Sequence, residues 1–182
     1  MATATAITHE YFGPIADLPC WNVTAEYGSW LSLRFGQPHL RIREGTPEAK
    51  LKSLKRRAVF VEGEFLLWVE MGVWEMSEER KRLFHSEQSR GYLHRAAARL
   101  DGQKLARVEI KPTPLGTIFT FDHGCKLHVR AAEGAASDEA LWHIYGLDKC
   151  LSLLADGTLE YGPSKGNKRH RMSVRNVDYA AS

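Results

Sequence analysis

The sequence predicts an α+β protein: a mainly antiparallel β-sheet, arranged as a sandwich or an open barrel-like sheet, with one principal helix packed on it. Many short segments alternate apolar and polar residues with period two, which is typical of half-buried strands. Turn signals separate these segments at close intervals, as in a meander. A single stretch shows helical spacing. The 182 residues, 43% of them hydrophobic, suit one domain with its own core.

The first predicted hairpin lies near the N-terminus. Residues 30–35 read WLSLRF, with apolar side chains at every second position. Residues 36–38 (Gly-Gln-Pro) signal a turn, and residues 39–43 resume the alternation. Together they predict two paired strands with one apolar face and one face that carries arginines. The polar residues 44–55 that follow predict a loop.

A second hairpin is predicted around Gly63. Residues 57–62 and 64–70 flank this glycine and are rich in Val, Phe, Leu and Trp. The second of these segments is apolar on both faces. It is therefore expected to be a central strand that is covered on each side.

The principal helix is predicted near residues 87–100. Leu93 and Leu100 are seven residues apart, at the two ends of an apolar stripe suited to packing on a sheet. Ser86 is the expected N-cap. Gly102 is expected to adopt the left-handed conformation that often ends a helix.

The C-terminal half predicts a series of short strands. They cover residues 104–110, 117–121, 125–129, 141–145, 149–154 and 158–161. Asp-His-Gly, Gly-Leu-Asp and Ala-Asp-Gly turns separate several of them. This spacing favours an antiparallel arrangement of neighbouring strands.

The two ends of the chain are expected to differ from the domain at residues 17–162. Residues 1–16 show no clear periodicity and predict a flexible N-terminal arm. Residues 163–182 contain few apolar and many basic residues, and predict a disordered basic tail. The formal net charge of the chain is +3, and this basic character is expected to reside in the tail.

Composition excludes several classes of protein. The longest apolar stretch is far shorter than the ~20 residues that a membrane span needs, and the N-terminus lacks the pattern of a secretory signal. Three widely spaced cysteines do not suggest a disulfide framework. We therefore expect a cytoplasmic protein without a membrane partner.

One short segment contains candidate metal ligands. His123, Cys125 and His128 fall within six residues, and zinc binds thiolate and imidazole groups. Strand parity opposes such a site, because Cys125 shares the apolar face of Leu127 and Val129 while His128 points to the other face. We expect a buried thiol and no bound metal.

Signals for catalysis and for cofactors are weak. The sequence has no nucleophile elbow, Walker loop or dinucleotide fingerprint, so no cofactor and no catalytic residue is predicted. A small hydrolase that uses a histidine with a serine or cysteine remains an alternative. Its site would be a concave pocket lined by His85, His94, His143 or Cys150.

A nucleic-acid-associated protein is a further alternative. The basic tail could contact phosphates without sequence specificity, and a second basic cluster occupies residues 50–57. No aromatic RNA-binding motif accompanies these charges. Protein binding is therefore the leading interpretation.

The predicted binding patch consists of Trp30, Arg34, Arg41 and Arg43. These residues share the outward face of the first hairpin, opposite its leucines and isoleucine. Tryptophan beside arginine is a frequent composition of interface anchors. The sequence therefore predicts a non-enzymatic protein-binding module, with an unspecified protein partner and oligomeric state.

Several strand and turn phrases together resemble a known kind of protein. They are WLSLRFG (30–36), EFLLWV (64–69), LDGQKL (100–105), FTFDHG (119–124) and LADGTL (154–159). They resemble small, stand-alone, uncharacterised bacterial proteins, some of them similar in style to immunity proteins of toxin systems. The resemblance spans most of residues 17–162. It implies a β-rich fold and a bacterial cytosolic setting, and no activity or site residue.

Overall fold

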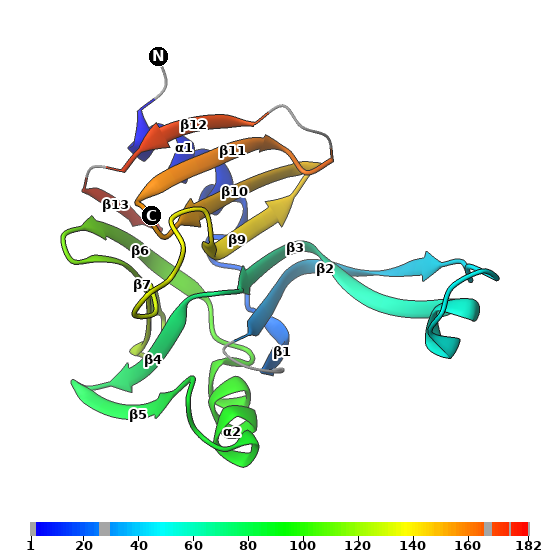
Figure 1. Cartoon of the computed structure of the whole chain (residues 1–182). Coiled ribbons are helices and arrows are strands. Elements are labelled where there is room, and N and C mark those ends of the chain that lie inside the picture. Colours follow the sequence, from blue (N-terminus) through cyan, green and yellow to red (C-terminus); the bar gives the residue numbers. More distant parts are fainter. Residues whose placement is uncertain (1–2, 26–29, 166–168, 175, 182) are drawn as a thin grey trace.

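The structure, a computed structural model, describes residues 3–25, 30–165, 169–174 and 176–181. The described strands form two antiparallel sheets that do not close into a barrel (Figure 1). The larger sheet has the order β1 (Trp21–Ala25), β2 (Leu31–Arg43), β3 (Ala58–Val69), β9 (Ala140–Gly146), β10 (Lys149–Leu154), β11 (Thr158–Pro163) and β12 (His170–Ser173). The smaller has the order β13 (Val177–Ala180), β6 (Leu105–Pro112), β7 (Leu115–Phe121), β8 (Cys125–Arg130), β4 (Val73–Glu78) and β5 (Lys81–His85). The predicted α+β class is confirmed.

The two sheets share one hydrophobic core. Their inner faces contribute leucines, valines and aromatic rings to a single cluster of buried residues. Trp142 of β9 crosses this core, and its indole N–H donates a hydrogen bond of 2.8 Å to the Thr117 hydroxyl of β7. Helix α1 (Ala4–Phe12) packs against β13 and β9, and α2 (Arg90–Leu100) packs against β1 and β5. Each helix therefore contacts both sheets, and the two helices lie at opposite ends of the molecule in Figure 1.

The N-terminal segment is not the flexible arm that the sequence predicted. Residues 4–12 form α1, and the short 3-10 helix η1 (Gly13–Ile15) follows. Phe12 and Ile15 have no exposed surface. Phe12 also packs against the rings of Phe119 and Trp142. The buried residues of α1, which are Ile7, Thr8, Tyr11 and Phe12, repeat at helical spacing only once, and so short a run does not stand out in the sequence.

The C-terminal segment corrects the prediction of a disordered basic tail over 163–182. Strand β12 pairs with β11, and β13 pairs with β6. Val177 and Tyr179 are buried, and Asp178 forms a salt bridge with Arg107 of β6. Alternation over only four residues was too short to stand out in a polar sequence.

The strands β2 and β3 also differ from the prediction. Residues 36–38 form no turn, and Gly63 does not separate two strands; β2 and β3 are long partners of each other. A β-bulge replaces the predicted turn, because two residues of β2, Gly36 and Gln37, lie opposite the single residue Glu64 of β3.

Glycine and two polar side chains stabilise the bulge. Gly36 has φ +75°, a conformation that side chains disfavour. The Glu64 carboxylate accepts a hydrogen bond of 2.9 Å from the Gln37 backbone N–H, and the Trp21 indole donates one of 2.9 Å to the Gly36 carbonyl. The polar backbone of the bulge is thus paired.

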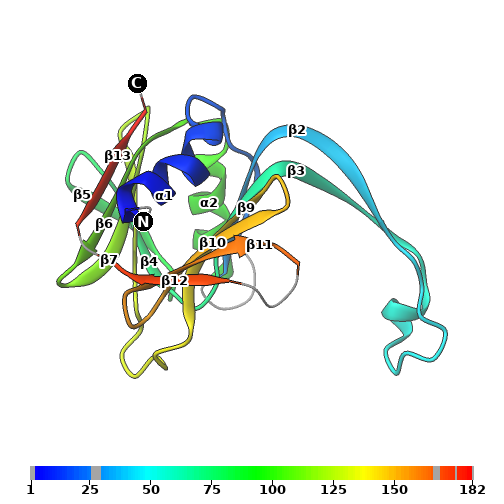
Figure 2. The same ribbon diagram turned by 90° about the horizontal axis from the view of Figure 1, so that it is seen from above.

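Beyond the bulge, β2 and β3 leave the body of the protein as a two-stranded projection (Figures 1 and 2). We call its residues 40–61 the ribbon. The 3-10 helix η2 (Lys52–Lys55) lies at its far end, within the segment predicted as a loop.

The principal helix begins later than predicted. Its N-cap is Ser89, and Ser86 lies outside it. The Ser86 hydroxyl is buried and accepts a hydrogen bond of 3.2 Å from the Trp74 backbone N–H. Gly102 has φ +87°, as expected for the residue that follows the helix.

We expect Gly63→Ala to destabilise the protein and to disturb the departure of the ribbon. A Cβ at this position would lie 2.6 Å from the Phe35 carbonyl oxygen, which belongs to the rigid backbone of the bulge. The cost should be about 1–3 kcal/mol in the free energy of unfolding, measured with denaturant. Gly134→Ala is the control, because a Cβ there would meet no atom within 4 Å although its φ of +78° adds strain. An equal or smaller loss at Gly63 would contradict the close approach.

We also expect Tyr179→Ala to destabilise the protein by about 3 kcal/mol, since it removes a buried ring from the core. Asp178→Ala, on the exposed side of the same strand, should change stability little. Thermal or denaturant unfolding of the two variants would check this. If both variants unfold like the wild type, β13 does not belong to the folded core.

Candidate functional site

The outer face of the larger sheet is the face turned away from the core. Cross-strand pairing aligns Ser32, Trp68, His143, Ser152 and Glu160 in one row across this face. A parallel row runs from β2 to β10 and contains Arg34, Leu66, Tyr145 and Cys150. The site described below is built on these two rows.

A cleft of about 610 Å³ lies on the outer face where the ribbon joins the body. Its floor includes Leu66, Trp68 and Tyr145, which are half-buried. We define the cleft by its lining residues, which are Arg34, His39, Glu62, Gly63, Glu64, Leu66, Trp68, Tyr145, Gly146, Leu147, Asp148 and Ser164. The outer face of β3 therefore borders an open hollow, and not the second covering layer that the sequence predicted.

A smaller hollow of about 220 Å³ continues the cleft toward Trp30. The two share Arg34, Leu66 and Trp68. Trp30 is 39% exposed and meets the Trp68 ring edge-to-face at 5.6 Å between centroids. Trp68 in turn lies beside His143, and His143 beside Tyr145. Neighbouring strands thus supply a continuous line of rings, a surface well suited to an apolar binding partner.

The four residues of the predicted patch all lie on the outer side of β2, but in two groups. Trp30 and Arg34 both line the smaller hollow, and Arg34 donates a hydrogen bond of 2.9 Å to the Asn22 carbonyl. Arg41 and Arg43 lie on the ribbon, about 20 Å farther along the strand. Both guanidinium groups flank the Phe60 ring.

The two ribbon arginines are already engaged within the chain. Arg41 forms a salt bridge of 2.5 Å with Glu62, and Arg43 donates a hydrogen bond of 3.3 Å to the Ser53 carbonyl. Arg43 thereby links β2 to the far end of the ribbon. These contacts give Arg43 a structural role besides the binding role that the sequence suggested.

The opposite side of the ribbon carries four exposed aliphatic residues, which we call the apolar stripe: Leu40, Ile42, Val59 and Val61, with exposed fractions of 67%, 58%, 56% and 47%. The pairing of β2 with β3 places all four on one side. This side continues the face that buries Leu33 and Phe35 within the body. The sequence predicted an apolar face here, but the structure leaves it uncovered.

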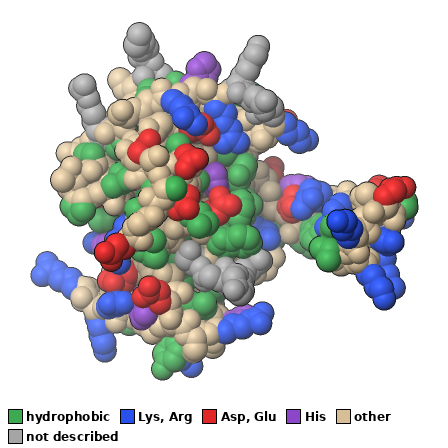
Figure 3. Space-filling model, viewed as in Figure 1, with side chains coloured by type: hydrophobic (Ala, Val, Ile, Leu, Met, Phe, Trp, Pro, Cys, Tyr) green, Lys and Arg blue, Asp and Glu red, His purple; other side chains and the backbone are tan. Residues whose placement is uncertain are grey.

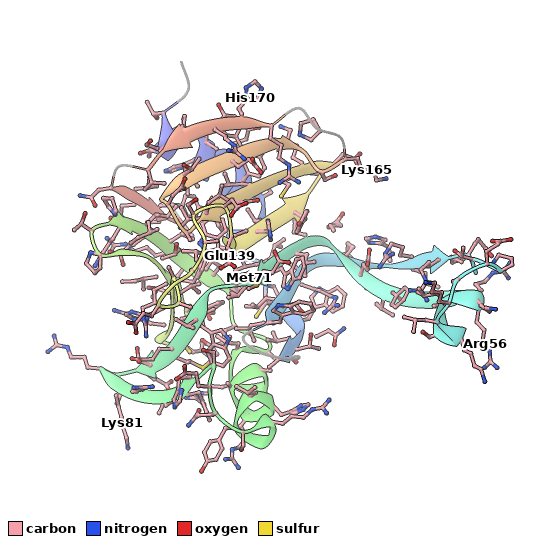
Figure 4. The ribbon with its side chains drawn as sticks, in the orientation of Figure 1. Arg56, Met71, Lys81, Glu139, Lys165 and His170 are labelled. Carbon is pink, nitrogen blue, oxygen red and sulfur yellow. The ribbon has the colours of Figure 1, made fainter. Side chains whose placement is uncertain are left out.

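The ribbon is strongly basic. Between residues 40 and 61 the chain has seven Lys or Arg and two Glu, whereas the whole chain has a net charge of only +3. Several basic side chains lie on the projection in Figure 3, and Arg56 lies at its far end in Figure 4. The ribbon thus contains the second basic cluster that the sequence identified at residues 50–57, in addition to the basic C-terminal segment.

A hydrogen-bonded chain of side chains lies beneath the outer face beside the cleft. The Ser152 hydroxyl lies 2.7 Å from His143 Nδ1, and His143 Nε2 lies 2.8 Å from Glu70 Oε2. Cys150 Sγ lies 3.5 Å from the Ser152 hydroxyl. Burial, which outweighs the hydrogen bond that His143 donates to Glu70, lowers the pKa of His143. A neutral imidazole satisfies the chain, with Nε2–H donating to Glu70 and the Ser152 hydroxyl donating to Nδ1.

This chain has the order of groups found in serine hydrolases, but its geometry opposes that chemistry. Ser152 and Cys150 have no exposed surface, so a substrate carbonyl cannot reach either nucleophile. Burial also raises the pKa of the Cys150 thiol, which disfavours the reactive thiolate. We interpret the chain as a buried polar network that fixes β9 and β10 beneath the cleft.

The other candidate residues lie apart. His94 is exposed on α2, and His85 lines a different hollow beside Trp74 and Arg130. Cys125 points into the core, where burial raises its pKa to about 11, in agreement with the predicted parity. The described residues contain no group of three or more His, Cys, Asp or Glu side chains arranged to hold a metal ion. Nor do they contain a helix long and apolar enough to cross a membrane.

Sequence reasoning missed much of the cleft. Leu66 and Trp68 were visible as the second apolar face of a strand, and only the assumption of a covering layer hid them. Tyr145, Glu64 and Asp148 gave no signal, because they come together through pairing of distant strands. Comparisons of this chain with models of protein families, with curated proteins and with solved structures found no match.

The His143 network predicts a specific dependence of stability on pH. Because the pKa of His143 is lowered on folding, the unfolded chain binds a proton first as the pH falls below the usual value of 6.5. The stability contributed by neutral His143 is therefore complete above that pH and is lost below it. His143→Gln should flatten the decline of melting temperature between neutral and mildly acidic pH. His123→Gln, at an exposed turn, should leave the slope unchanged, and equal slopes in all three proteins would contradict the account.

Proposed function

We propose that this chain is a non-enzymatic protein-binding module that uses the cleft and Trp30 to hold its partner. The observation that carries the proposal is the pair of half-buried rings of Trp68 and Tyr145 in a hollow of about 610 Å³, with the exposed Trp30 ring in the adjoining hollow. Such rings give a large apolar contact area at a small cost in conformational entropy. Arg34 beside Trp30 adds a polar anchor of the kind enriched in interfaces.

The rim of the cleft favours a partner with positive charge. Glu64 and Asp148 line it together with Glu62, which is already paired with Arg41, against Arg34 as the single arginine of the lining. Complementary charge would steer such a partner to the cleft and fix its orientation there. An apolar, basic protein segment is therefore the best fit.

The two alternative functions have less support. A hydrolase would need an accessible serine or cysteine, and the pairs formed with His143 are buried. Nucleic-acid binding through the tail is weakened because Glu160 forms salt bridges with both Arg169 and Arg171. Lys168 and Arg175 of the tail lie outside the described residues. A cytoplasmic, bacterial, immunity-like role would agree with protein binding and stays a prediction.

The proposal can be tested by site-specific photo-crosslinking in the native host. A photoreactive residue replaces His39, an exposed residue of the cleft rim, and a second variant carries it at Tyr92 on α2 as the control. We expect a crosslinked species of one defined mass from position 39 alone. Mass spectrometry would identify the protein joined to the cleft.

The Trp30→Ala variant tests whether the crosslink at position 39 depends on binding through Trp30. Loss of an interface anchor should weaken binding by about 2 kcal/mol or more and remove most of the product. The folded state should lose less than about 1.5 kcal/mol, because Trp30 is partly exposed and has one edge-to-face contact. If position 39 yields no defined product, or if Trp30→Ala leaves its yield unchanged, the cleft is not the binding site.

A further inference from the structure

Two apolar surfaces of this chain are uncovered in the described structure, and they complement each other. The apolar stripe lies on the ribbon, and the aromatic cleft lies at the ribbon's root on the opposite side of β2 and β3. We propose that the partner in the cleft is the ribbon of a second copy of this chain, and that two copies exchange their ribbons in a symmetric dimer. This inference rests on the proposed function, since it names the protein that the cleft binds.

The ribbon has the composition of an element that needs a partner. A two-stranded hairpin is marginally stable by itself in water, and the ribbon stands away from the core. Its stripe holds four aliphatic side chains, each about half exposed or more. Packing this flat side on aromatic rings would bury all four. The cleft of the second copy therefore covers the apolar stripe, which the body of its own chain leaves exposed.

Charge selects this pairing. The charge that can meet the cleft lies at the far end of the ribbon, on Lys50, Lys52, Lys55 and Arg56, because Arg41 pairs with Glu62, Arg57 pairs with Glu44, and Arg43 lies on the side opposite the stripe. The cleft offers Glu64 and Asp148 against Arg34. Beyond the end of β3, Met71 is 43% exposed, and Glu139 is its neighbour in Figure 4. The Met71 backbone N–H donates to the carbonyl of Ala140, which follows Glu139. An apolar and basic ribbon thus faces an apolar and acidic surface.

Two-fold symmetry limits the assembly to two copies. Each copy has one ribbon and one cleft, so an exchange uses both surfaces of both copies and leaves none for a third. A single ribbon–cleft contact is small compared with a standard interface, which buries about 1,600 Å². The repeated contact doubles the buried area. The dimer is therefore expected in preference to an open chain of copies.

The sharpest test mixes two variants of the full chain. The ribbon variant, Ile42→Thr with Val61→Thr, removes apolar surface and keeps β-branched side chains. The cleft variant, Trp30→Ala with Asp148→Asn, alters the receiving surface, and asparagine tolerates the φ of +58° at position 148. Sedimentation velocity would follow self-association over about three decades around micromolar concentration.

The exchange predicts a distinctive pattern. The wild type should dimerise, and each variant alone should associate about tenfold more weakly or worse, because both of its contacts are damaged. An equimolar mixture should associate more strongly than either variant, since one contact in the mixed dimer joins an unchanged ribbon to an unchanged cleft. Added salt should weaken the wild-type dimer.

Controls separate folding from association. Melting curves of each variant should resemble the wild type, because the altered side chains are exposed. Tyr92→Ala on α2 removes an aromatic ring that is 45% exposed, and it should dimerise as the wild type does. If the ribbon variant fails to fold, Lys52→Glu with Lys55→Glu alters charge at the far end without changing the stripe and should also weaken the dimer.

Each contrary result overturns the exchange. If the wild type is a monomer at all concentrations, the exchange is wrong. If that monomer binds a short DNA duplex, the ribbon is a nucleic-acid-binding element instead. A cleft variant that dimerises normally would show ribbon-to-ribbon stacking, and a mixture no stronger than the variants would exclude the reciprocal contact. If the crosslink from position 39 contains a different protein, the exchange fails and the proposed function stands. If no crosslink forms, both fail.

Discussion

The β-bulge between β2 and β3 is the constraint on which the rest of the structure depends. It adds one residue to β2, between Phe35 and Pro38. The apolar residues of β2 have odd numbers before the bulge and even numbers after it, and they all lie on the same side of the strand pair. Leu33 on the body and Leu40 on the ribbon therefore lie on the same face of the pair. Without the extra residue, the arginines of the ribbon would continue the core face. The bulge thus determines that the stripe and the cleft lie on opposite sides of the same two strands.

The fold class was predictable because it follows from local alternation. The period-two pattern correctly identified residues 31–35, 117–121 and 125–129 as strands and placed Cys125 in the core. It also placed Arg34 and Arg41 on one side, because a turn and a one-residue bulge change the parity in the same way. The pattern could not distinguish the two, since Gly36 at positive φ suits either structure. Whether the chain forms a turn or a bulge at this position is determined by the pairing of β2 with β3, which is a long-range contact.

The site was less predictable than the fold for a related reason. Glu70 lies 73 residues before His143 in the sequence, and the pairing of β3 with β9 brings the two side chains together. Ser152 joins them through the register of β9 with β10. Tyr145 reaches the cleft through the same pairing. The predicted disorder at the C-terminus failed where Tyr179 packs against α1. Each of these features depends on the partner of a strand, whereas local sequence reports only that a strand exists.

The central claim is that the stripe and the cleft are two halves of one protein-binding surface. Hydroxyl-radical footprinting, read by mass spectrometry residue by residue, tests this most directly. As the concentration of the chain rises, Leu40 and Ile42 on the ribbon should become protected together with Trp30, at the same midpoint, while Tyr92 stays reactive. Protection of only one of the two surfaces, or of neither, would contradict the account.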